Sequence, residues 1–251
     1  KKMLRYALPL VPASIFWWIT NASDQFFVAA MLEDGTAAIV YTLDRTPAEE
    51  TSNTENYEIV YSVLDSNQQV VKNQQLTSDE VLDENPQITT AVLQGKEQFV
   101  MGWYRQEQNP DTQTMQSDIR MASVDGAGTI TTADVGMADS LAQATGGRNL
   151  SVDANFHFVQ AASSSVDSLS LVWSALDDSQ TADSTAAQTG LLRAVRFAEE
   201  NGRIHTSAVV DLAQMEDGTV IDAFSAYSSG ENQIKALILG SYYTGETDSG
   251  I

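Results

Sequence analysis

The sequence contains no cysteine and few basic residues. Without cysteine, the chain can form no disulfide, no thiolate metal site and no cysteine nucleophile. Its 13 lysines and arginines are outnumbered by 34 aspartates and glutamates, which gives a formal net charge of −21. A surface this acidic repels nucleic acid phosphates and anionic membranes. We therefore expect no nucleic acid partner and no membrane insertion.

Catalytic motifs are equally scarce. The two histidines, His157 and His205, stand 48 residues apart, and no serine or aspartate motif accompanies them. No glycine-rich phosphate loop is present. With 34 acidic residues, many carboxylate pairs resemble a glycosidase dyad, so none is singled out. The sequence therefore assigns no catalytic residue and leans away from an enzyme.

A three-fold repeat is what the sequence does contain. Three segments consist of a strand pattern, a turn and a second strand that ends on an aromatic residue: Tyr41, Trp103 and Trp173. These aromatic residues are 62 and 70 residues apart. A third strand pattern follows each pair, at residues 59–65, 119–125 and 192–197, and leads into a hairpin turn and a fourth strand. Four-stranded units of this period predict an all-β protein, a β-propeller with antiparallel blades of about 60–70 residues.

The expected domain organisation is a single β-propeller over residues 1–251, with blades at about 23–82, 83–146 and 147–216. Leu4 to Leu8 fits the third-strand pattern, so residues 1–22 are predicted to pair with residues 217–251 as two half-blades. The same apolar run resembles a signal peptide, but Pro9 and Pro12 interrupt it and favour the strand interpretation. Two arrangements stay open: a closed four-bladed ring, or an arc of a larger propeller.

The repeat varies most between its second and third strands. These segments, residues 45–56, 106–116 and 178–188, are rich in Thr, Ser, Gln, Asp and Glu. Loops of this kind are either recognition surfaces or solvated hairpin tips. The candidate binding residues on and beside them are Asp44, Asp111, Asp177, Asp178 and Asp183. No cofactor is required; calcium is the candidate ligand because it prefers clustered oxygen donors.

The segment Asp125-Gly126-Ala127-Gly128-Thr129 is the nearest match to the Asp-box of sialidases, although it lacks the serine ahead and the tryptophan behind. The chain as a whole resembles bacterial β-propellers of the sialidase-like kind and their non-enzymatic cell-surface relatives. The resemblance implies a non-catalytic binding or scaffolding domain of a secreted or surface-attached bacterial protein. Its partner would be a protein or carbohydrate ligand, or other domains of the same polypeptide. The alternative is a glycan-active hydrolase or lyase on a propeller scaffold.

Overall fold

The protein is all-β. The computed structural model describes residues 27–45, 57–79, 81–108, 115–136, 155–160, 169–176, 189–200, 203–216, 218–230 and 233–242. None of these residues is helical, so this part of the chain holds no helix long and apolar enough to span a membrane. The expectation of an all-β fold is confirmed; no closed ring is found among the described strands, and the choice between a closed ring and an arc of a larger propeller stays a prediction.

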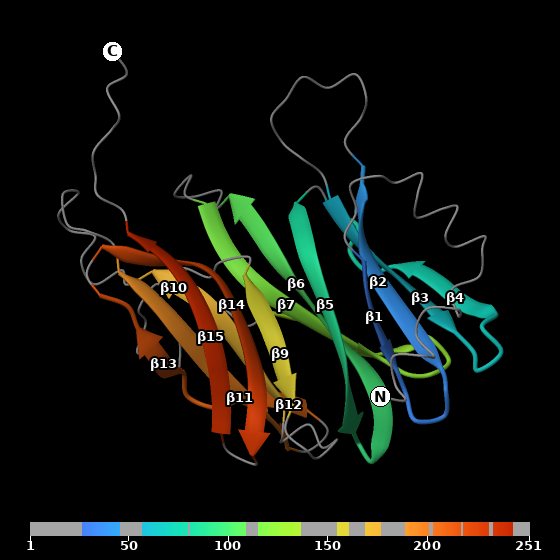
Figure 1. Cartoon of the computed structure of the whole chain (residues 1–251). Helices are drawn as coiled ribbons and strands as arrows, with labels where there is room; N and C mark the ends of the chain where they lie inside the picture. Colours follow the sequence, from blue (N-terminus) through green and yellow to red (C-terminus); the bar gives the residue numbers. More distant parts are fainter. Residues whose placement is uncertain are drawn as a thin grey trace. The chain divides into compact units, whose positions relative to one another are not determined.

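The strands form three larger antiparallel sheets and a two-stranded ribbon (Figure 1). The first sheet consists of β1 (Phe27–Met31), β2 (Ala37–Asp44), β3 (Tyr57–Leu64) and β4 (Val70–Gln75). The second consists of β5 (Leu82–Leu93), β6 (Lys96–Gln108), β7 (Met115–Val124) and β8 (Ile130–Gly136). The third consists of β9 (Phe156–Gln160), β10 (Leu169–Leu176), β11 (Gly190–Glu200), β12 (Arg203–Thr206) and β13 (Val210–Gln214). The ribbon consists of β14 (Thr219–Gly230) and β15 (Gln233–Tyr242).

The register shows that the repeat in the sequence is a repeat in structure. On the first sheet Tyr41 of β2 pairs with Val60 of β3, and on the third sheet Trp173 of β10 pairs with Arg193 of β11. These are matched positions of the repeat, because Val60 and Arg193 occupy the same place in the third-strand pattern. The two sheets therefore share strand order and register.

The turn after the third strand is built twice in the same way. The side-chain oxygen Oδ1 of Asp65 accepts hydrogen bonds from the backbone N–H groups of residues 67 and 69, each at 2.9 Å. Oδ1 of Asp125 accepts the equivalent bonds from residues 127 and 129, at 3.0 and 2.7 Å. The third turn residue has a positive φ in both cases, 65° at Gln68 and 78° at Gly128. An aspartate that caps its own turn explains why Asp ends both third strands.

Two core clusters lie between successive sheets. One cluster of buried residues joins Val40 and Tyr61 of the first sheet to Met101 and Trp103 of the second. The Tyr61 hydroxyl also donates to the carbonyl oxygen of Gly128, at 3.0 Å. A second cluster joins the third sheet to the ribbon, and its members include Val172, Leu192, Ile221 and Phe224. Burial of strands on both faces explains their nearly continuous apolar sequences.

The chain divides into two compact units. The first comprises residues 1–90, 97–116 and 120–135, and the second comprises residues 91–96, 117–119 and 136–251. The predicted pairing of residues 1–22 with 217–251 cannot be followed, because residues 1–26 and 243–251 lie outside the described residues.

The third sheet departs from the predicted pattern at its edge. The repeat predicts one continuous fourth strand after the third strand of each unit. The structure has two short strands instead: β12 pairs with the end of β11, and β13 pairs with its beginning. Between them, the backbone N–H of Ser207 donates to the carbonyl oxygen of Arg196 at 2.8 Å, and the Ser207 hydroxyl accepts from the Arg196 N–H at 3.0 Å. The Ser207 hydroxyl also donates to the carbonyl oxygen of Ala208 at 2.9 Å, and a serine that bonds to the neighbouring backbone in this way interrupts the strand.

Candidate functional site: a buried carboxylate cluster

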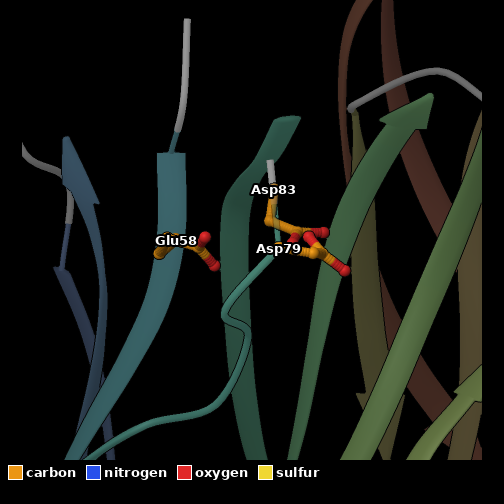
Figure 2. Close-up of side chains that lie close together, drawn as sticks. All are labelled: Glu58, Asp79 and Asp83. Carbon is orange, nitrogen blue, oxygen red and sulfur yellow. The ribbon is translucent and has the colours of Figure 1, made fainter. Parts of the chain in front are cut away.

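Three acidic side chains meet between the first and second sheets (Figure 2). Glu58 belongs to β3, Asp79 lies in the connection between β4 and β5, and Asp83 belongs to β5. One carboxylate oxygen from each lies within 4.8 Å of the others. Glu58 is 3% exposed and Asp83 is 0% exposed, whereas the Asp79 side chain is 46% exposed. The cluster therefore reaches from the interior to the surface.

Thr77 holds the Glu58 side of the cluster. Its hydroxyl donates to Oε2 of Glu58 at 2.5 Å and accepts from the backbone N–H of Ile59 at 2.9 Å. Both capacities of this buried hydroxyl are thus used. Because Thr77 lies two residues after the end of β4, these bonds fix the start of the β4–β5 connection against β3.

Strand β6 supplies the donors to the two aspartates. The indole Nε1 of Trp103 donates to Oδ1 of Asp83 at 2.9 Å. The Arg105 guanidinium reaches both carboxylates: its NH2 group lies 2.5 Å from Oδ2 of Asp79, and its NH1 group 3.4 Å from Oδ2 of Asp83. Glu107 approaches the same guanidinium at 3.7 Å. Alternate residues of β6 therefore present a tryptophan and an arginine to the carboxylates.

Burial dominates the electrostatics of the cluster. Removal from water raises the pKa of Asp83 to about 7, although the positive charge of Arg105 acts in the opposite direction. Burial also raises the pKa of Glu58, against the lowering effect of its hydrogen bond from Thr77. Three carboxylates share one nearby guanidinium, and protonation of Asp83 relieves part of the excess negative charge. Burial therefore brings the pKa of Asp83 to near neutral.

The cluster has the donor set of a site for a hard cation, since three carboxylates could each offer an oxygen. Arg105 already provides a positive charge there, bonded to two of the three carboxylates. Trp103 and Thr77 donate one further hydrogen bond each, to Asp83 and to Glu58. The arrangement thus has the form of a buried polar network that joins two sheets and is held by the donors of its own side chains.

The binding residues predicted from the sequence lie elsewhere. Asp44 is exposed at the end of β2. Asp111, Asp177, Asp178 and Asp183 fall outside the described residues, so the structure neither gathers nor separates them. The acidic cluster contains none of these five residues.

His157 and Arg193 have packing roles. His157 of β9 stacks edge-on against Phe224 of β14, with ring centroids 4.9 Å apart, and burial lowers the pKa of its imidazole. Arg193 is 8% exposed, and its Nε lies 2.8 Å from Oδ1 of Asp211 on β13. Both side chains connect neighbouring strands or sheets, and neither approaches the carboxylate cluster.

The cluster could not be singled out from the sequence, because nothing in the sequence distinguishes its three members among the 34 acidic residues. One signal was available. Asp83 stands 20 residues before Trp103, and Asp153 stands 20 residues before Trp173, the matched tryptophan of the next repeat. An aspartate repeated at a fixed distance from a buried indole indicates a structural acceptor.

Comparison with known proteins adds no family assignment: no protein-family model matches the chain, and no curated protein matches it.

Proposed function

We propose that this protein is a non-catalytic binding or scaffolding domain that uses its sheets as propeller-type blades and its long polar connections as the recognition surface. The observation that carries the proposal is the position of those connections. In each of the three larger sheets, the longest connection joins the second strand to the third. The connections lie between β2 and β3, between β6 and β7, and between β10 and β11.

The difference in length between these connections and the short turns supports the assignment of the recognition surface to the connections. Residues 32–36 and 65–69 close tight turns in the first sheet, and residues 94–95 close the first hairpin of the second sheet. Short turns with specific hydrogen bonds fix register, whereas long polar segments do not. A scaffold that keeps its strands constant and varies one connection per sheet is typical of a recognition module.

The buried cluster supports the non-catalytic part of the proposal. Catalytic carboxylates need access to a substrate and a free proton position. Asp83 is fully buried and is bonded to Trp103 and Arg105, and Glu58 is bonded to Thr77. This network stabilises the contact between two sheets, and we assign it a structural role.

The acidic, hydroxyl-rich connections favour neutral or cationic partners. At the net charge of −21, an anionic partner is repelled at low salt. A carbohydrate or a protein surface without negative charge fits this chemistry, as does calcium bound to the loop carboxylates and carbonyls. In keeping with the resemblance to cell-surface propellers, we propose that the domain acts outside the cell and that its partner is a ligand or another domain of the same polypeptide.

A binding panel tests the proposal. Neutral glycans, peptides and calcium are titrated into the protein while its melting temperature is followed, because a ligand that binds only the folded state raises it. The three long connections are then replaced by short Asn-Gly turns, singly and together. We expect a ligand of the native protein whose effect is lost in the triple variant, while the variant keeps its far-UV spectrum.

The alternative, a glycan-active enzyme, predicts a different outcome. Turnover of a glycoside or uronide substrate, abolished by one conservative carboxylate substitution in a variant that still folds, would replace the binding proposal with the enzyme. Ligand binding that survives replacement of all three connections would place recognition on another surface.

A further inference from the structure

The ribbon β14–β15 carries exposed apolar side chains on one of its faces. Ile234 and Ile238 of β15 pack against the core cluster that the ribbon shares with the third sheet. Because the side chains of a strand alternate between its two faces, Leu237 and Leu239 lie on the opposite face, which we call the outer face. Leu237 is 77% exposed and Leu239 is 64% exposed. An exposed apolar patch of this kind is typical of a contact with another protein surface.

The edge of β15 is the second feature of the ribbon. In the three larger sheets the corresponding second strands, β2, β6 and β10, each pair with a neighbour on both sides. Among the residues that the structure describes, β15 pairs only with β14. An edge of ten residues, Gln233–Tyr242, offers backbone N–H and C=O groups to another strand.

The sequence of β15 lacks the features that commonly protect an edge strand. Proline, bulges and charged side chains keep most edges from pairing with another chain. Lys235 is the only charged residue of β15, and the strand contains no proline. Its register with β14 is continuous from Ile234 to Leu239, so no bulge interrupts the middle of the strand. The edge is therefore suited to pairing with another strand.

The charge of the ribbon favours a second copy of this chain as the partner. The chain has a net charge of −21, but β14 carries one acidic residue, Asp222, and β15 one basic residue, Lys235. Two copies repel each other through their excess of acidic residues, and this repulsion acts over about 10 Å at 0.1 M salt. A contact through the two ribbons brings together strands that have no net charge.

We propose that two copies of this chain associate through their β15 edges, which pair antiparallel about a two-fold axis at Ile238. The two ribbons then form one four-stranded sheet in the order β14-β15-β15-β14. In such a symmetric contact, residues at equal distances on either side of the axis oppose each other. Leu237 of each copy lies opposite Leu239 of the other, so four leucines meet on the outer face. Directly opposed apolar side chains on neighbouring strands stabilise a sheet.

The same register opposes the two charges of the ribbon. Lys235 of one copy lies opposite Ser241 of the other, and alternation places both on the outer face. Within each copy the Ser241 hydroxyl donates to Oδ1 of Asp222 at 2.9 Å, so the Asp222 carboxylate lies beside Ser241. Lys235 therefore approaches Asp222 of the second copy, and symmetry forms this ion pair twice. The inference is independent of the recognition role of the long connections.

Sedimentation equilibrium at a series of protein concentrations tests the proposal on the unmodified chain and two charge-reversal variants. Lys235→Glu and Asp222→Lys each place like charges opposite one another in a homodimer. We expect each substitution to raise the dissociation constant of the dimer at least about tenfold, because like charges across an interface weaken association. The matched control is Lys96→Glu, which makes the same change of net charge at an exposed lysine of β6 and should leave the dissociation constant unchanged.

An equimolar mixture of the two variants gives the sharpest result. In their heterodimer the two reversed charges oppose each other in one pair, and the native Lys235 and Asp222 oppose each other in the second pair. We expect the mixture to dimerise about as strongly as the unmodified chain, while far-UV spectra show that each variant is folded.

Three results would overturn the proposal: an unmodified chain that stays monomeric at every concentration, an equal loss of dimer in Lys96→Glu, or a mixture that does not recover the dimer. Hydrogen exchange on the unmodified protein gives an independent reading. The amides of β15 that do not bond to β14 should exchange more slowly as the protein concentration rises. Slow exchange at every concentration in a monomer would assign the edge to a strand of the same chain and contradict the dimer.

Discussion

Replacement of Asp83 by asparagine tests whether the buried cluster is a structural network with a pH-dependent contribution. Asparagine keeps a side-chain oxygen that can accept the hydrogen bond from Trp103 Nε1, at 2.9 Å in the native protein. It removes the ionisable group whose pKa burial raises to about 7. The groups that face Asp83 are Glu58, Asp79 and Arg105, and the arginine stays charged throughout the range of interest.

The sign of the pH dependence of stability follows from the direction in which the pKa of Asp83 is shifted. The folded state holds the Asp83 proton up to about pH 7, whereas the unfolded chain releases it near its ordinary value of 3.8. Between these values the folded state binds more protons, so the free energy of unfolding falls as pH rises. With 1.36 kcal/mol per pKa unit, the contribution of Asp83 decreases by roughly 2 to 3 kcal/mol between pH 5 and pH 8.

Urea unfolding of the native protein and of Asp83→Asn, followed at several pH values from 5 to 8, measures this contribution. Because other carboxylates titrate in both proteins, the difference between the two curves is the informative quantity. We expect the native protein to lose stability relative to Asp83→Asn as pH rises. Asp222→Asn, at an exposed carboxylate of β14, is the control and follows the native curve. Parallel curves for native protein and Asp83→Asn would refute the reasoning.

Three further outcomes are expected. Gly128→Ala should destabilise the fold by more than 1 kcal/mol, since a new Cβ would lie 2.4 Å from Cβ of Lys72 at a φ of +78°. Gly95→Ala is the control for the backbone cost alone, because Gly95 has a φ of +71° and no atom within 4 Å of the new Cβ. Equal losses of unfolding free energy in the two variants, measured by urea unfolding, would contradict the steric argument. Asp153→Ala should lower the free energy of unfolding by about 1 to 3 kcal/mol. The buried Nε1 of Trp173 finds no acceptor among the described residues, and Asp153 precedes Trp173 by the same number of residues as Asp83 precedes Trp103. A loss no larger than that of Asp111→Ala would contradict a hydrogen bond between Trp173 and Asp153. Calcium at millimolar concentration should raise the melting temperature, and an unchanged value would leave the long connections as solvated spacers.

The strand repeat could be predicted from the sequence because three physical signals coincide in it. Alternating apolar residues mark strands, and Asp at residues 65 and 125 marks the turns. Each of these aspartates accepts two backbone hydrogen bonds in the structure. An aromatic residue fills the same second-strand position in each sheet. Local chemistry determines all three, so no knowledge of distant contacts was needed.

The carboxylate cluster could not be predicted in the same way. Glu58, Asp79 and Asp83 come from two strands and a connection, and only the packing of one sheet on the next brings them together. Burial turns Asp83 from one acidic residue among 34 into a group with a strongly raised pKa. The interruption between β12 and β13 was missed for a related reason: the Ser207 hydroxyl bonds to the backbone of Ala208 and of Arg196 on the neighbouring strand, and the strand ends where the apolar pattern continues.

The most direct test of the central claim compares the long connections with the buried cluster in one binding experiment. One variant replaces residues 45–56, 109–114 and 177–189 by short turns, and the other carries Glu58→Gln together with Asp83→Asn. Each is titrated with a ligand that raises the melting temperature of the native protein. We expect binding to be lost in the first variant and kept in the second. Binding kept without the connections and lost with the two carboxylates would contradict it and make the cluster the functional site.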